Sequence, residues 1–117
     1  MTNQELHKKT KHFVYQTIMA FQTFEDNKNK VLIDEIVQSA TRMSAYCRNA
    51  CEEEQKEVSP AALNQCGDFL GEIIYLLNLL DNTKTIEHIK TENLVIDALE
   101  LKQIVLHICD DADKADT

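Results

Sequence analysis

The chain has 117 residues, which is the length of one domain. It contains two glycines and one proline, whereas a β-sandwich or a barrel needs many turns built from those residues, so the composition excludes an all-β fold and predicts an all-α one. Its net charge of −8 at pH 7 disfavours nucleic acid and anionic lipid as partners, because like charges repel.

Targeting signals are missing from the sequence. The N-terminal stretch MTNQELHKKTKH has no apolar segment of the kind that signal peptides carry. The longest apolar run, from Ile73 to Leu80, is interrupted only by Asn78 and is much shorter than the ~20 residues that cross a bilayer. We therefore expect a cytoplasmic protein that does not bind membranes. In that reducing compartment the four cysteines should be thiols and not disulfides.

Apolar residues recur with the period of a helix in four segments. The first helix is expected over residues 2–24, because Thr2-Asn3-Gln4-Glu5 forms a capping box and polar residues follow Phe24. The second helix is expected over residues 28–54, and its apolar arc is wide enough to contact more than one neighbour.

The second half of the chain predicts two further helices. The third is expected over residues 60–80, because Ser59 suits the N-cap and Pro60 the first helical position. The fourth is expected over residues 86–109, and residues 113–117 should form a frayed acidic tail. Four helices with short links predict a single-domain, up-down-up-down antiparallel four-helix bundle over residues 1–112.

The third and fourth helices also carry apolar residues outside their core stripes. A monomeric bundle needs one apolar stripe per helix, so a second stripe indicates a surface covered by a partner, most simply a second copy of the chain. Scattered apolar side chains are also ordinary on protein surfaces and need no partner. The candidate interface residues are Tyr75, Leu79, Val95, Leu99 and Leu106.

In the expected topology the four cysteines fall near one end of the bundle. They are Cys47, Cys51, Cys66 and Cys109. A zinc site needs four converging thiolates, but the C-x₂-C spacing that usually builds one is missing from this chain. Buried core cysteines are therefore the favoured interpretation, and a zinc-stabilised bundle is an alternative.

No pattern in the sequence predicts catalysis or a cofactor. The histidines share no ligand spacing, and the Glu-x-x-His pair of di-iron bundles is missing. Gly67 and Gly71 lie inside the third expected helix, where glycine more often permits close helix packing than binds a ligand. Acidic neighbours such as Asp34 and Glu35 point to different sides of a helix and cannot act as an acid/base pair. We expect a protein that is not an enzyme.

Positive charge is concentrated in the first half of the chain. Residues 1–60 have a net charge of −1, and residues 61–117 have one of −7. The candidate nucleic-acid contacts are Lys8, Lys9, Lys11, Arg42 and Arg48. Such a local basic pole is the feature through which an acidic protein could still bind phosphate. The competing interpretations are a solvated helix end for the lysines and an ion pair of Arg48 with Glu52.

Three segments carry a family pattern at ungapped offsets. They are IVQSATRMSAYCRNA from Ile36, followed by EEEQK; Leu63 with EIIYLLNLL from Glu72; and LVIDALEL from Leu94. Together they resemble the small bacterial four-helix-bundle family that includes ribosomal RNA intervening-sequence proteins and the accessory protein of diversity-generating retroelements. The resemblance covers about residues 30–108.

This resemblance implies a bundle without catalytic residues and, as in characterised relatives, a homopentameric barrel. For the retroelement branch it implies binding of nucleic acid and of a reverse transcriptase through a basic surface. The chain departs from the family at Gln38, where a basic residue is common, and at Asp110-Asp111, where the last helix is usually lysine-rich. We therefore expect a non-enzymatic, self-associating scaffold or accessory protein, with a nucleic-acid-binding accessory module as the alternative.

Overall fold

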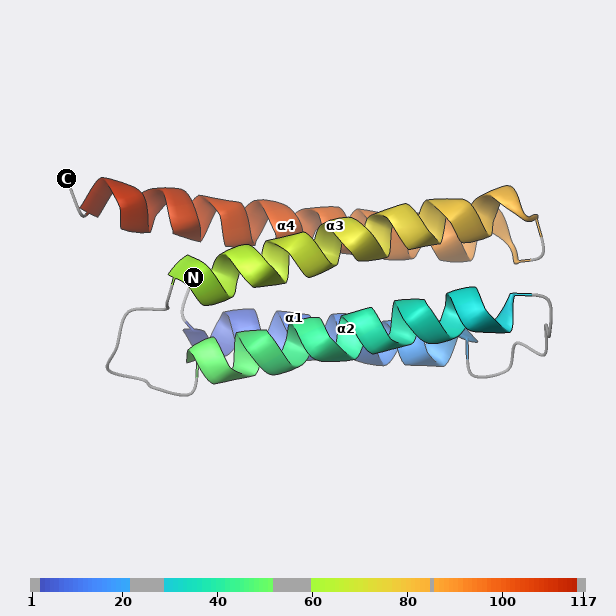
Figure 1. The fold of residues 1–117 in the computed structure, drawn as a ribbon, viewed down its shortest axis with the longest axis horizontal. Coiled ribbons are helices and arrows are strands. Elements are labelled where there is room, and N and C mark those ends of the chain that lie inside the picture. Colours follow the sequence, from blue (N-terminus) through green and yellow to red (C-terminus); the bar gives the residue numbers. More distant parts are fainter. Residues whose placement is uncertain (1–2, 22–28, 52–59, 85, 116–117) are drawn as a thin grey trace.

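The computed structural model describes residues 3–21, 29–51, 60–84 and 86–115, and it is all-helical and without strands over these residues (Figure 1). The helices are α1 (Asn3–Phe21), α2 (Lys30–Cys51), α3 (Pro60–Asn82) and α4 (His88–Ala115). They lie side by side along the longest of the molecule's three dimensions, which measure 49 × 22 × 20 Å. The all-α class expected from the scarcity of glycine and proline is confirmed.

Most helix ends lie close to the expected positions. α3 begins at Pro60, whose fixed φ angle suits the first turn. The expected ends of the first helix at residue 24 and of the second at residue 54 lie outside the described residues. α4 begins at His88 and continues to Ala115, well beyond the end expected near residue 109. Polarity alone does not end a helix, and no glycine or proline follows Cys109.

Each helix packs against the next one along the chain. α1 also packs against α4, and this is the smallest of the four interfaces between helices. In Figure 1 α1 and α3 begin at the same end of the molecule, and α2 and α4 end there. α4 extends beyond the other helices at that end. These contacts are consistent with a bundle around one core.

Each helix buries one stripe of side chains, as the apolar spacing predicts. The buried residues include Leu6, Thr10, Phe13 and Thr17 of α1; Ile36, Ala40, Met43 and Cys47 of α2; Leu63, Cys66, Leu70, Ile73, Leu77 and Leu80 of α3; and Leu94, Ala98, Leu101 and Val105 of α4. The hydroxyl groups of the two threonines are satisfied within their own helix. Thr10 donates to the carbonyl of His7 at 2.9 Å, and Thr17 donates to that of Phe13 at 2.8 Å.

None of the helices, over the residues described, combines the length and the apolar character that crossing a membrane requires.

Candidate functional site: the outer face of α3 and α4

The outer face of the α3–α4 pair carries apolar side chains that the core does not use. We call Tyr75, Leu79, Val95, Leu99 and Leu106 the apolar strip. Tyr75 is 63% exposed, and the three leucines are 39–45% exposed. Val95 is half-buried and packs against the core, so it forms the inner edge of the strip.

Helix geometry places the strip along the boundary between the two helices. Val95, Leu99 and Leu106 follow one face of α4, because residues four and eleven apart nearly coincide around a helix. Lys102 belongs to the same row, and its Nζ atom lies 3.3 Å from the position that a Cβ atom would occupy at Gly71 of α3. Tyr75 lies one turn beyond Gly71, so the α3 row borders the same boundary.

The structure adds Ile96 to this surface. Its side chain is 49% exposed, and with Val95 and Asn78 it lines a hollow of about 260 Å³ between the helices. Sequence reasoning missed Ile96 because it lies outside the row of Val95 and Leu99. Its spacing of three residues from Leu99 was the signal that could have found it, since residues three apart are neighbours on a helix.

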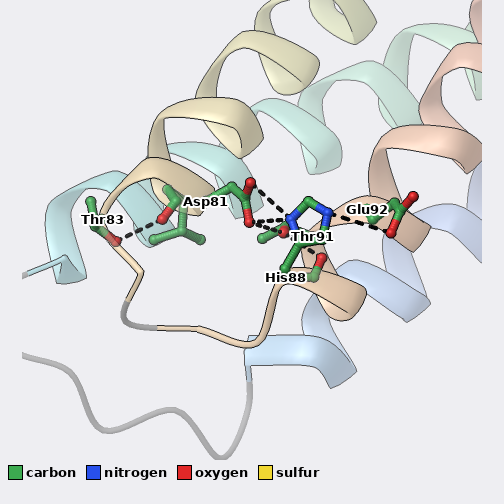
Figure 2. A network of polar contacts seen from close by, with 6 residues as sticks. Asp81, Thr83, His88, Thr91 and Glu92 are labelled. Atoms are coloured by element: carbon green, nitrogen blue, oxygen red, sulfur yellow. Dashed lines mark hydrogen bonds and ion pairs between the residues drawn. The ribbon is translucent and has the colours of Figure 1, made fainter.

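A network of polar contacts lies at the α3–α4 turn, at one end of the same face (Figure 2). Asp81 in the last turn of α3 accepts a hydrogen bond from His88 Nδ1, which lies 2.8 Å and 2.9 Å from the two carboxylate oxygens. The buried hydroxyl of Thr91 donates to the same carboxylate at 2.9 Å. His88 Nε2 lies 3.5 Å from a carboxylate oxygen of Glu92. The network therefore ties the end of α3 to the first turn of α4.

These contacts shift the ionisation of both partners. The hydrogen bonds from His88 and then Thr91 hold the pKa of Asp81 below its ordinary value. The hydrogen bond to Asp81 raises the pKa of His88. The arrangement does not form a nucleophilic triad, because the Thr91 hydroxyl donates to the carboxylate and not to the imidazole. Its role at this position is to hold two helices together.

The turn itself contains a residue in the left-handed region. Lys84 has a φ of 56°, which non-glycine residues rarely adopt, and its N–H donates to the carbonyl of Asp81 at 3.1 Å. The Thr83 hydroxyl donates to the Leu80 carbonyl at 2.6 Å and accepts a hydrogen bond from the Asn29 side chain at 3.2 Å. This last bond connects the residue that precedes α2 to the α3–α4 turn.

Two of the four candidate zinc ligands lie in the core. Cys47 and Cys66 are fully buried, and the thiol of Cys66 donates to the Met43 carbonyl with an Sγ–O distance of 3.7 Å. The side chains of Cys51 and Cys109 lie outside the described ones. Among the described residues no group of three or more histidine, cysteine or acidic side chains could hold a metal ion.

The candidate nucleic-acid contacts are exposed but point in several directions. Lys8 and Lys9 line a hollow opposite the carboxylates of α4, and Lys11 follows them on α1. Arg42 and Arg48 lie on α2, six residues apart, which separates them by about a third of a turn around the helix. The start of α1 and the end of α2 meet at the same end of the molecule (Figure 1). Arg42 lies near the middle of α2 and Arg48 near its end, so the five side chains do not form one basic face.

Searches of family models, of curated proteins and of solved structures find no match to this chain.

Proposed function

We propose that the protein is a non-enzymatic, self-associating helical bundle of the scaffold or accessory type, whose subunits meet through the apolar strip. The observation that carries this proposal is the exposure of Tyr75, Leu79, Leu99 and Leu106 together on one face. An exposed apolar patch that spans two packed helices is typical of a surface that another protein covers.

The free energy gained by burying the apolar strip can be compared with the cost of association. Full burial of one such side chain contributes about 1.5–3 kcal/mol, so a side chain that is already half-buried contributes about 1 kcal/mol more. The four exposed strip residues would then supply about 4 kcal/mol from each subunit, or about 8 kcal/mol for a contact between two copies, which lies within the range of the cost of association. Ile96, at 49% exposure, and Ile89, at 61%, lie seven residues apart on α4 and would add to the contact.

We infer an up-down-up-down antiparallel topology for the subunit. The packing of every helix on its neighbours in the chain supports it, as do the short links between them. We also propose that the chain belongs to the bacterial four-helix-bundle family and that it assembles as a homopentamer. Its support is the sequence pattern, together with the burial of the small residues Ser39 and Ala40 within it. A cytoplasmic location completes the proposal.

Native mass spectrometry of the untagged protein tests self-association. We expect a species heavier than the 13.4 kDa subunit, and a pentamer if the family proposal holds. Leu99→Glu should shift this species toward the monomer and leave the far-UV circular dichroism unchanged, because assembly would then have to remove a carboxylate from water.

Gln38→Glu is the matched control. It makes the same change of charge at an exposed position of α2, away from the strip, so its assembly should equal that of the wild type. A Leu99→Glu variant that assembles normally would contradict the assignment of the interface, and a wild-type monomer would contradict self-association. The same spectra test the two alternatives, because bound zinc or co-purified nucleic acid would add mass.

A further inference from the structure

The boundary between α1 and α4 contains an open hollow. It has a volume of about 250 Å³, and its walls come from the first half of α1 and the middle of α4. α1 and α4 form the smallest helix interface, which leaves space between their backbones for this opening. The hollow lies away from the apolar strip, so it is independent of the proposed self-association.

The floor of the hollow is part of the hydrophobic core. Phe13 of α1 is 2% exposed, Leu101 of α4 is 4% exposed, and Ile104 is half-buried against the core. A hydrocarbon group entering the hollow would cover the part of Ile104 that is still exposed, and removing that apolar surface from water favours its binding.

The two walls carry opposite charges. Lys8 and Lys9 are the charged residues that line the hollow from α1, whereas Asp97 and Glu100 line it from α4. No ion pair within 4.0 Å joins the two walls among the described residues. Each wall thus presents side chains of one charge, and the side chains of the opposite charge lie on the other wall.

We propose that this hollow binds a small zwitterion with an apolar side chain, of the class of the free aliphatic and aromatic α-amino acids. The ligand carboxylate contacts Lys8 and Lys9, its ammonium group contacts Asp97 and Glu100, and its side chain rests on the apolar floor. A ligand with a charge of one sign would meet repulsion from one wall, whereas a zwitterion satisfies both.

The size of the hollow limits the ligand. A volume of about 250 Å³ corresponds to roughly eight water molecules of ~30 Å³ each. Leucine, with nine non-hydrogen atoms, is of this size. Most sites for larger ligands begin at about 300 Å³, so the hollow suits the small end of the range.

Isothermal titration calorimetry at low salt tests the proposal with L-leucine and L-phenylalanine. Three partial analogues of leucine separate the contributions: 4-methylpentanoate lacks the ammonium group, isoamylamine lacks the carboxylate, and glycine lacks the apolar side chain. We expect leucine or phenylalanine to bind and each analogue to bind at least about tenfold more weakly, because each loses one charge-assisted contact or the contact with the floor.

Two variants and two matched controls assign the site. Lys9→Gln and Glu100→Gln should each weaken leucine binding about tenfold, whereas Lys30→Gln and Glu35→Gln, at exposed positions of α2, should not change it. No binding of either amino acid at millimolar concentration would overturn the proposal. If leucine binds both variants as tightly as the wild type, the proposed site is wrong. If 4-methylpentanoate binds as tightly as leucine, the ligand need not be a zwitterion and that part of the proposal is wrong.

Discussion

Replacing Gly67 by alanine should stabilise the protein, because nothing in its surroundings requires a glycine. The residue lies within α3, and no described glycine has a positive φ. A Cβ atom built at position 67 would lie 3.9 Å from Cγ1 of Val105, an ordinary van der Waals distance. The close packing that the sequence suggested for Gly67 is therefore not needed for contact with α4.

The expected gain follows from two contributions. Glycine in a helix interior is about 0.8–1.0 kcal/mol less favourable than alanine. The added methyl group is buried, and burial of one carbon contributes up to about 0.8 kcal/mol. The sum is about 1–2 kcal/mol in the free energy of unfolding, which for a domain of this size corresponds to a rise of about 4–8 °C in Tm.

Thermal and urea denaturation followed by far-UV circular dichroism, at one protein concentration, measure the effect. Gly71→Ala is the comparison, since its Cβ would meet the Nζ atom of Lys102 at 3.3 Å, and that flexible end has to move. We expect a smaller gain there than at position 67. An unchanged or lower Tm for Gly67→Ala would refute the reasoning, and a simultaneous loss of assembled mass would show that another subunit approaches this glycine.

Three further substitutions test the core, the polar network and the turn. Leu70→Ala, at a position with 0% exposure, should cost about 2–5 kcal/mol in urea denaturation, and a cost below about 1 kcal/mol would contradict its central position. His88→Gln should lower Tm most between pH 4 and pH 6.5. The lowered pKa of Asp81 gives the folded protein stability that is present above pH 3.8 and is lost in acid. The raised pKa of His88 gives stability that is present below pH 6.5 and is lost at higher pH. A difference that is the same at every pH would count against the Asp81–His88 pair. Lys84→Gly should raise stability by up to about 1 kcal/mol by relieving the left-handed conformation at φ 56°, and a decrease in Tm would rule this out.

The features that the sequence predicted well depend on local properties. The number of helices follows from the 3.6-residue spacing and the scarcity of chain-breaking residues, and Pro60 marks the start of α3 from its ring geometry alone. Phe13 and Leu70 could be assigned to the core because they lie at the centre of an apolar stripe. Exposure of Leu99 could be anticipated because it lies outside such a stripe.

The features that the sequence did not predict depend on contacts between elements. The hydrogen bond of His88 to Asp81 joins residues on either side of a turn, and its geometry is set by how α4 leaves α3. The hollow beneath Lys9 and Glu100 arises between helices at opposite ends of the chain. No local pattern carries this information, because the relative placement of two helices is a property of the packed core.

The order of contacts between the helices has a consequence for how fast the chain folds. α1 with α2, α2 with α3 and α3 with α4 are neighbours both in sequence and in space, so each pair can form as a hairpin with a short loop to close. Among the four described helices, the contact of α1 with α4 alone joins distant parts of the chain, and it is the smallest of the four interfaces. Such a low contact order is typical of proteins that fold in microseconds to milliseconds. The docking of α1 against α4 should then be the last step of folding and the first to be lost on unfolding.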